Sequence, residues 1–348
     1  MPMNAVPTMR QLVIEQPGRL AWQERARPRL QTNVDALVRP LVVGRCDLDV
    51  AFVRGVVPIP VGTALGHECI AEVIEVGDGV SSLAPGQRVL VSAQISCGLC
   101  DMCRRGHTGR CLAVPFGASF GMGRAGDFGG ALTDCLRVPF ADAMLVPLPS
   151  NLDPIETISV ADMALDAWRA VGPHLQERPG AAVLVAGGTP SVIGLYAAAI
   201  ALAMGAAEVV YVDDDDQRRS RAKLIGARCA SRGDSLGARF DIVVDACGDS
   251  SLLSQTLSYA APEAIFTSVT IYLDSPVSLP LREMYFKGIT FHTGRPNVRP
   301  AMEHVLALCR AGCFKADAVP AKVFDFNEAD EAWLSSELRT AVVRAWCW

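Results

Sequence analysis

The sequence predicts a two-domain α/β protein, in which a mostly β region is combined with a doubly wound parallel sheet. Three observations lead to this prediction. The chain has 348 residues, its first 150 residues contain short strand-like segments, and strand and helix patterns alternate after about residue 155. A chain of this length is too long for one ordinary compact core, so two domains are expected.

The first region is built from short apolar segments that end at glycine or proline. These segments predict strands at 36–44, 69–77 and 87–93. The glycine-rich stretch 121–130 predicts a loop between further strands. We therefore expect a mostly β domain here.

The second region alternates between strand and helix patterns. Residues 156–171 predict a helix, and 181–188 form a short apolar run that ends in glycines. The pattern continues with helix 191–205, strand 208–213, helix 216–227, and strands 240–248 and 263–273. This alternation indicates a doubly wound parallel sheet.

The last segment carries one helix pattern at 301–312 and a closing strand-like run from Arg339. We expect this tail to fold back onto the first domain. The predicted domains are therefore 1–158 together with 295–348, and 159–294.

Composition and charge exclude several classes of protein. Half of the residues are hydrophobic, a fifth are charged, and the net charge is −5 with no basic block, which argues against a nucleic-acid partner. The longest apolar run, 192–204, contains Gly194 and is too short to span a bilayer. The first residues show no signal-peptide pattern, so we expect a cytoplasmic protein that acts on a small molecule.

Four of the twelve cysteines crowd into one short segment of the predicted β domain, the lobe at about 94–113. Their spacing is C-x2-C-x2-C-x7-C, and without a signal peptide this pattern favours metal binding over disulfides. Four thiolates complete a tetrahedral zinc site with no open position, so we predict a structural zinc. An iron–sulfur cluster remains an alternative. The four residues are Cys97, Cys100, Cys103 and Cys111.

A glycine turn joins the apolar run 181–188 to the helix that follows. The amides at such a helix start can bind a pyrophosphate, although Pro190 and a longer turn replace the strict G-x-G-x-x-G pattern. A plain βα turn remains the alternative. The expected binding residues are Gly187, Gly188, Thr189, Ser191 and Val192.

Asp213 ends the next strand, about twenty-five residues after the glycines. A carboxylate at this place can accept the hydroxyls of the adenine ribose and repels a 2′-phosphate. The sequence therefore favours NAD over NADP. The acidic residues 214–216 are expected to lie in a solvated loop.

Three sequence motifs, in their order along the chain, resemble the pattern of one protein family. Cys46 opens a Cys-x-x-Asp motif, Gly66-His67-Glu68 follows about twenty residues later, and the four lobe cysteines come next. The chain is similar over essentially its whole length to the zinc-containing medium-chain alcohol dehydrogenase/reductase family. The resemblance implies a GroES-like catalytic domain and a Rossmann coenzyme domain, with one catalytic and one structural zinc per chain.

The resemblance also implies roles for individual residues. Cys46, His67 and Asp162 would be the catalytic zinc ligands, leaving a fourth position open for water or substrate oxygen. Glu68 would be an alternate ligand behind the zinc, and Asp49 would hold the second nitrogen of His67. A solvated helix residue is the alternative for Asp162.

For the coenzyme, the resemblance implies that Arg218 lies near the adenine ribose and that Arg339 reaches the pyrophosphate. Relatives form dimers or tetramers, so a homo-oligomer is expected. The family oxidises alcohols or reduces carbonyls by hydride transfer to or from the nicotinamide.

The sequence departs from the family at the proton relay, where a Ser or Thr and a His are usual. Here those positions are Leu48 and Ala51, and neither can carry a proton. Asp166 lies four residues after Asp162, so on one helix both would share a face. We expect Asp166 to replace the relay as general acid/base, or else to bind coenzyme ribose or backbone.

Ala93 stands where relatives often place an aromatic pocket wall, which suggests a roomier site. The predicted function is therefore NAD-dependent oxidation of an alcohol, or reduction of a carbonyl, larger than ethanol. Two alternatives stay open: a reductase of imines or activated alkenes, and a non-catalytic binding relative.

Overall fold

The computed structural model describes residues 7–123, 125–237, 239–273 and 276–345. They form two compact units. The first comprises the chain up to Asp162, Asn297–Glu303 and the residues from Pro320 onward, and the second comprises Met163–Pro296 and His304–Val319. The predicted domains placed all of 295–348 in the first domain. In the structure His304 stacks on Trp168 of the second unit at 5.3 Å between ring centroids, and its segment belongs there.

The first unit is mostly β. Its elements are β1 (Thr8–Gln16), β2 (Arg19–Ala26), β3 (Ala36–Gly44), α1 (Asp47–Val53), β4 (Glu68–Val76), β5 (Arg88–Val91), α2 (Asp101–Arg104), η1 (Thr108–Arg110), β6 (Leu136–Val138), α3 (Ala141–Met144), β7 (Leu145–Pro147), α4 (Pro154–Thr157), η2 (Ile158–Ala161), β14 (Lys322–Asp325), η4 (Phe326–Glu328), α11 (Ala329–Leu334) and β15 (Thr340–Val343). Helix α10 (Val298–Arg310) begins in this unit and ends in the second.

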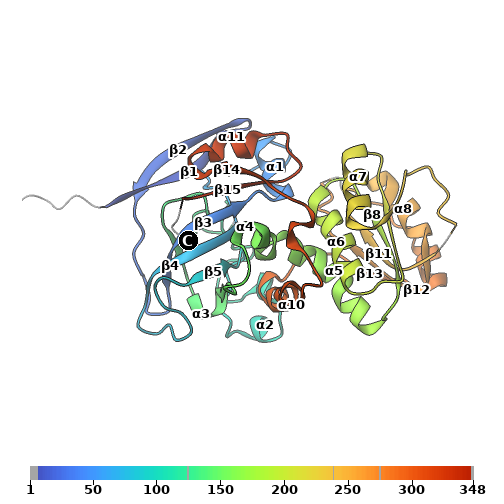
Figure 1. The fold of residues 1–348 in the computed structure, drawn as a ribbon, viewed down its shortest axis with the longest axis horizontal. Coiled ribbons are helices and arrows are strands. Elements are labelled where there is room, and N and C mark those ends of the chain that lie inside the picture. Colours follow the sequence, from blue (N-terminus) through green and yellow to red (C-terminus); the bar gives the residue numbers. More distant parts are fainter. Residues whose placement is uncertain (1–6, 124, 238, 274–275, 346–348) are drawn as a thin grey trace, which may run out of the picture. The chain divides into compact units, whose positions relative to one another are not determined.

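One seven-stranded sheet organises the first unit, in the order β14-β15-β3-β4-β5-β7 with β6 also paired to β3 (Figure 1). Strand β15 pairs antiparallel with β3, which confirms that the tail returns to this sheet. Leu12, Val43 and Trp333 are among the apolar side chains of its core. Strands β3 and β4 run antiparallel with Gly44 opposite Glu68, so the end of one strand lies beside the start of the other.

The second unit alternates between strands and helices, as its sequence pattern predicts. Its elements are α5 (Met163–Glu177), β8 (Ala182–Ala186), α6 (Ser191–Ala203), β9 (Glu208–Val212), α7 (Asp216–Ile225), β10 (Arg228–Ala230), β11 (Phe240–Asp245), α8 (Ser250–Ser258), β12 (Ala260–Ser268), α9 (Leu281–Lys287), β13 (Thr290–His292) and η3 (Ala316–Ala318).

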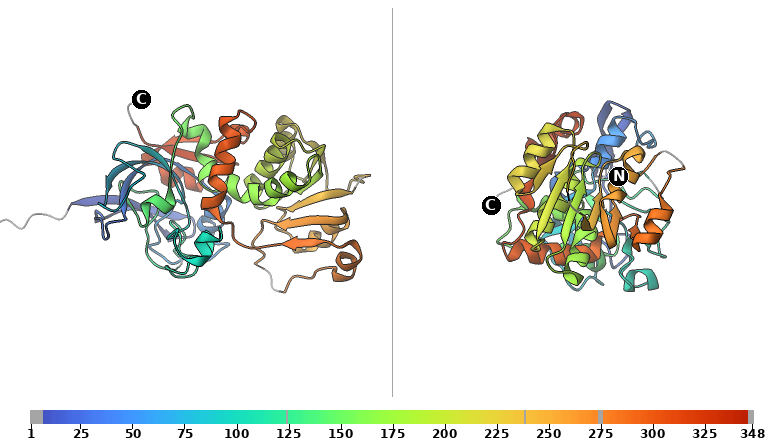
Figure 2. Two further views of the ribbon diagram at one scale, coloured as in Figure 1. Left: turned by 90° about the horizontal axis from the view of Figure 1, so that it is seen from below. Right: turned by 90° about the vertical axis from the view of Figure 1, so that its right-hand side faces the viewer.

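The sheet of the second unit has six strands in the order β10-β9-β8-β11-β12-β13, all of them parallel. Helices lie on both faces of this sheet (Figure 2). The strand order reverses between β8 and β11, and such a switch point is where doubly wound sheets bind ligands. Within the described residues, no helix combines the length and apolar character needed to cross a bilayer.

The single helix predicted at 156–171 is wrong. The structure has α4, the 3₁₀ turn η2 and then α5, with a break at Asp162, whose φ of −155° and ψ of −76° are not helical. Asp162 therefore precedes α5, while Asp166 lies in its first turn. The expectation that both residues share one helical face fails for this reason. Strand β12 also begins and ends earlier than the predicted strand 263–273.

Candidate metal centres and coenzyme site

Cys46 and His67 are brought together by the antiparallel pairing of β3 and β4. Cys46 follows the end of β3 by two residues and is the N-cap of α1. His67 immediately precedes β4. Because Gly44 and Glu68 are opposite each other in the ladder, the residues just beyond them meet at one edge of the sheet.

Asp162 reaches the same place from a third segment, because it directly follows η2. One ligand atom from each of Cys46, His67 and Asp162 lies within 4.8 Å of the other two. All three residues are buried, with Asp162 the most exposed at 9%. Thus the three predicted catalytic ligands form one group inside the first unit.

The His67 imidazole lies between two carboxylates. Its Nε2 lies 3.4 Å from Asp162 Oδ2, and its Nδ1 lies 3.6 Å from Asp49 Oδ1. The other Asp49 oxygen accepts a hydrogen bond from the Cys46 amide at 3.0 Å, which ties α1 to the same group. Neither imidazole nitrogen has a hydrogen-bond partner among the described residues. Nε2 therefore faces Asp162 of the predicted ligand group, and Nδ1 faces Asp49, which is predicted to hold the imidazole.

The electrostatics of this group indicate a shortage of positive charge. Burial and the Asp162 carboxylate raise the pKa of the Cys46 thiol well above its ordinary value. Burial also raises the pKa of Asp49. Burial opposes protonation of His67, yet Asp49 and Asp162 together raise its pKa to about 9. A divalent cation would supply the missing charge and hold Cys46 as a thiolate, so these residues fit a zinc ion.

Glu68 follows His67 as the first residue of β4 and is fully buried. Room for its side chain comes from Gly44 on the neighbouring strand. A Cβ at Gly44 would lie 2.1 Å from Glu68 Oε2, and Ile158 closes the same space at 3.2 Å. Gly44 is therefore needed for Glu68 to occupy this position.

The departures from the family pattern also lie near this edge. Leu48 and Ala51 are on α1, and neither side chain offers a proton-carrying atom. Ala93 is fully buried, and its carbonyl accepts a hydrogen bond at 3.0 Å from the amide of Phe120, which directly precedes the 121–130 loop region. Ala93 is thus covered by protein, and its small size does not by itself enlarge a substrate site.

The four lobe cysteines also form one group, with their sulfur atoms within 4.8 Å of one another. Backbone amides point at these sulfurs, which favours thiolates. The contacts are Leu99 N and Cys100 N to Cys97 Sγ at 3.4 and 3.3 Å, Leu112 N to Cys100 Sγ at 3.4 Å, and Cys97 N and Ala113 N to Cys111 Sγ at 3.4 Å.

The amides of Leu112 and Cys103 lower the pKa of the Cys100 thiol to about 6, whereas burial raises the pKa values of Cys103 and Cys111. Asn297, which precedes α10, supports the lobe from outside by accepting hydrogen bonds from Gly109 N at 3.1 Å and Arg110 Nη1 at 3.3 Å. A closed set of four sulfurs fits a tetrahedral zinc with no position left for substrate.

In the second unit, the glycine turn lies between β8 and α6, at the switch point of the sheet. Thr189 N donates to Cys247 O at 3.2 Å. A Cβ at Gly188 would lie only 2.2 Å from the same Cys247 oxygen. Ser191 and Val192 open the thirteen-residue helix α6. The predicted residues therefore form one tight turn at a helix start, which suits a pyrophosphate.

Asp213 follows β9 and is fully buried. Arg218 holds both of its oxygens, with Nε at 2.6 Å from Oδ2 and Nη2 at 2.8 Å from Oδ1. Tyr211 and the amide of Asp215 bind the same carboxylate at 3.2 and 3.0 Å. Although burial opposes it, Arg218 lowers the pKa of Asp213. Asp213 and Arg218, predicted separately, therefore act as one pair.

Asp166 forms an ion pair with Arg169 on the same helix. Arg169 also donates to the carbonyl of Ser268 at 3.3 Å. Any acid/base role for Asp166 would therefore involve a carboxylate that is already paired with Arg169. Arg339 is buried just before β15 in the first unit, so its predicted contact with the coenzyme remains a prediction.

Several polar residues at this end of the second unit escaped the sequence reasoning. They include Arg169, and also Asp245, whose buried carboxylate binds side chains from distant segments. No spacing in the sequence connects these residues. The available signal was the position of Asp245 at the end of an apolar strand pattern, because carboxyl ends of parallel strands carry binding residues.

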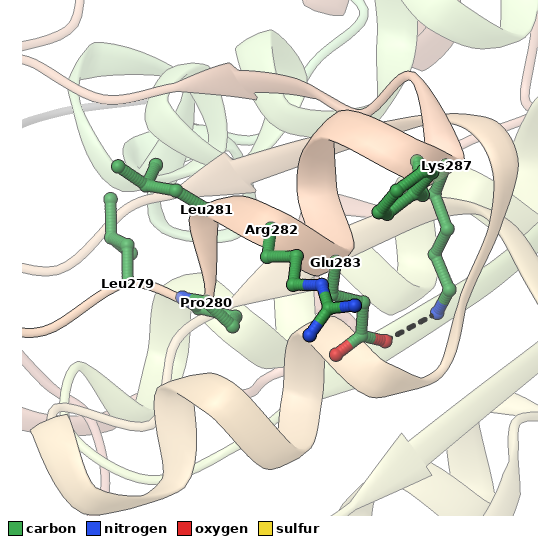
Figure 3. A pocket seen from close by; sticks show the side chains of 7 residues that line it. Leu279, Pro280, Leu281, Arg282, Glu283 and Lys287 are labelled. Atoms are coloured by element: carbon green, nitrogen blue, oxygen red, sulfur yellow. Dashed lines mark ion pairs between the residues drawn. The ribbon is translucent and has the colours of Figure 1, made fainter.

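A surface hollow of about 710 Å³ lies along α9, and none of the predicted site residues lines it. It is lined by residues 279–283, Phe286 and Lys287, and a 2.7 Å ion pair joins Lys287 to Glu283 (Figure 3). Phe286 and Leu281 are largely exposed there. Nothing in its chemistry relates this hollow to the metal groups or to the glycine turn.

Comparison with known proteins agrees with these features. The alcohol dehydrogenase GroES-like domain model matches residues 32–150, and the zinc-binding dehydrogenase model matches residues 192–309. The solved structure of an alcohol dehydrogenase from Thermus sp. ATN1 is 31% identical, with a TM-score of 0.88. The match covers 97% of this chain and 100% of that one.

Two curated relatives are also similar. A probable zinc-binding alcohol dehydrogenase of Mycobacterium tuberculosis is 27% identical over 350 residues, which cover 97% of this chain and 88% of that protein. The L-galactonate-5-dehydrogenase of Escherichia coli is 34% identical over 217 residues, which cover 61% and 58%. The predicted GroES-like and Rossmann architecture is confirmed, and the chain belongs to the zinc-containing medium-chain dehydrogenase/reductase family.

Proposed function

We propose that this protein is a zinc-dependent oxidoreductase that transfers hydride between NAD(H) and an alcohol or carbonyl substrate. The group of Cys46, His67 and Asp162 carries the proposal, because three buried ligands leave one coordination position open. A zinc ion bound there would act as a Lewis acid on the substrate oxygen. Asp49 would orient His67, and the four lobe cysteines would hold a second zinc with a structural role.

The coenzyme part of the proposal is supported by the glycine turn and by Asp213. A buried carboxylate beside the turn suits the two ribose hydroxyls of NAD and disfavours a 2′-phosphate. Arg218 offsets part of this charge, so we expect preference for NAD rather than complete exclusion of NADP. Kinetics with both coenzymes test this preference: equal kcat/KM values for NAD and NADP would contradict it.

The proton must follow an unusual route, because Leu48 and Ala51 occupy the positions of the usual relay. Asp166 is our candidate for the group that accepts or returns this proton. Its ion pair with Arg169 fixes the position of this carboxylate at the start of α5. The variant Asp166→Asn tests the idea, since full turnover at every pH would exclude a relay through this residue.

The proposed function itself is tested by substrate profiling of the zinc-loaded protein. A panel of primary alcohols, secondary alcohols, polyols and the corresponding carbonyls should show NAD(H)-linked turnover for at least one member. Coenzyme carrying deuterium at the transferred position should place the label on the former carbonyl carbon. Label on an imine or alkene carbon would instead favour the reductase alternative, and no turnover with one zinc per chain would favour a binding relative.

We also propose that the protein is a homo-oligomer. Support comes from apolar side chains that are largely exposed on the second unit, in particular Leu281, Tyr285 and Phe286 of α9. Contiguous exposed apolar surface is uncommon on monomers. Light scattering after size-exclusion chromatography gives the mass directly, and a monomer at micromolar concentration would contradict this part of the proposal.

A further inference from the structure

Asp245 is a fully buried carboxylate that no predicted role uses. It ends β11, one of the two strands that flank the switch point of the parallel sheet. The glycine turn is its close neighbour, because the Cys247 carbonyl two residues later receives the Thr189 amide. Asp245 therefore lies where a doubly wound sheet binds its ligand.

Both oxygens of Asp245 accept hydrogen bonds, one from the next strand and its following loop and the other from Cys247. Oδ2 accepts from Ser268 Oγ at 2.7 Å and from Tyr272 OH at 2.8 Å. Oδ1 accepts from Cys247 Sγ at 2.9 Å and from Cys247 N at 3.2 Å. A backbone hydrogen bond joins the same two strand ends, since Val269 N donates to Asp245 O at 3.0 Å. One carboxylate thus fixes the ends of β11 and β12 together.

Ser268 is held from a second side as well. Its carbonyl accepts the hydrogen bond from Arg169, whose guanidinium is paired with Asp166 at the start of α5. Burial and the Asp245 charge raise the pKa of the Tyr272 hydroxyl, so Tyr272 remains a donor at physiological pH. Burial and the same charge raise the pKa of Cys247 to about 12. Tyr272 and Cys247 therefore keep their protons at physiological pH.

The direction of a bound dinucleotide follows from the sheet. Asp213 lies at the end of β9, on one side of the glycine turn, and suits the adenosine half. The other half must then extend across the switch point toward β11 and β12. We propose that Asp245 is a positioning residue for the nicotinamide half of the coenzyme, acting through Ser268 and Tyr272 to hold the end of β12 in place. This inference rests on the proposed use of NAD(H).

Binding of two ligands to the zinc-loaded protein tests the proposal. NADH carries the nicotinamide, whereas ADP-ribose has the same adenosine and pyrophosphate without it. In the variants Ser268→Ala, Tyr272→Phe and Asp245→Asn, the Kd for NADH should rise about tenfold, as expected for loss of a hydrogen bond to a charged group. The Kd for ADP-ribose should change by less than about twofold.

Two matched variants serve as controls. Tyr285→Phe removes an exposed hydroxyl on α9, and Ser258→Ala removes an exposed hydroxyl at the end of α8, so neither should alter NADH binding. If Asp245→Asn does not fold, the two milder variants decide the question.

Two outcomes would overturn the inference. One is unchanged NADH binding in the Ser268 and Tyr272 variants, and the other is equal weakening of both ligands, which would mean that Asp245 only supports the glycine turn. If the unaltered protein binds neither NADH nor ADP-ribose, the proposed coenzyme is wrong and the inference falls with it. The wild-type measurement therefore separates the two failures.

Discussion

The two metal groups of the first unit are built in opposite ways. The lobe group takes all four sulfurs from one segment, Cys97 to Cys111, and backbone amides of that segment stabilise its thiolates. The other group takes Cys46, His67 and Asp162 from three separate segments. Burial and the neighbouring Asp162 carboxylate raise the pKa of Cys46. In the lobe, burial likewise raises the pKa values of Cys103 and Cys111, but the Leu112 amide lowers that of Cys100.

This difference explains why the lobe group suits a structural metal and the group of Cys46, His67 and Asp162 suits a reactive one. The lobe contributes four sulfur ligands and the amides that contact them, so it would enclose a zinc ion fully. The group of Cys46, His67 and Asp162, which we call the dispersed group, depends on the register of β3 and β4 and on the break after η2. It gathers negative charge without completing a tetrahedral shell, which is the state expected of a Lewis-acid site.

The largest expected effect is the loss of activity in Cys46→Ala. Removal of this ligand should lower turnover at least about a thousandfold, roughly 4 kcal/mol of transition-state stabilisation. Zinc content should fall from two ions to one. Cys69→Ala is the matched control, because Cys69 is buried two residues after His67 and lies outside both groups. Comparable losses in the two variants would mean that packing, not metal binding, explains the effect.

Cys103→Ala should lower stability while leaving turnover nearly unchanged. Loss of the lobe zinc should cost about 3 kcal/mol of stability, or about 6–12 °C in Tm. Turnover per folded molecule at low temperature should stay within about threefold of the wild type. Thermal unfolding and active-site titration measure the two quantities, and Cys313→Ser, on an exposed cysteine, is the control. A selective loss of turnover with unchanged Tm would reverse the assignment of the two sites.

The contrast between the groups also explains what the sequence could predict. Spacing alone indicates the lobe, because its ligands are neighbours along the chain. Strand patterns locate β3, β4, β8 and β9 closely, since their side chains are buried. The break at Asp162 was missed because residues 156–171 have helical composition, and tertiary packing overrides such propensity.

The sequence could not predict the polar network around Asp245, for a different reason. Ser268 and Tyr272 lie 23 and 27 residues away along the chain, and only the parallel pairing of β11 with β12 brings them to this carboxylate. The role of Asp166 could be guessed from its distance to Asp162. Its Arg169 partner shows why that distance was insufficient, since the neighbouring charge changes the chemistry of the carboxylate.

Gly44→Ala should have a smaller effect that is confined to the dispersed group. The added methyl would meet Glu68 Oε2, and overpacking of this kind costs about 2 kcal/mol. A second change, Glu68→Ala, should recover this stability, whereas Glu68→Gln of equal size should not. Urea unfolding of the single and double variants measures the differences. Equal stability of both double variants would show that Glu68 is not the colliding group.

The smallest expected effect is a weakening of metal binding in Asp49→Asn. The amide keeps the shape but loses the charge that faces His67 Nδ1, so zinc affinity at this group should fall about tenfold. Competition with a chromogenic chelator measures it, and the lobe zinc should be unaffected. Asp47→Asn, on the same helix, is the control for loss of charge alone. An equal fall in zinc affinity in both variants would indicate a general electrostatic effect of negative charge and not a contact with His67.

The most direct test of the central claim is anomalous X-ray scattering at the zinc edge from crystals of the purified protein. The account predicts two peaks per chain, one within bonding distance of Cys46, His67 and Asp162 and one among the four lobe cysteines. A peak at the lobe alone, in protein that turns over substrate, would contradict the proposal that Cys46, His67 and Asp162 hold the reactive metal.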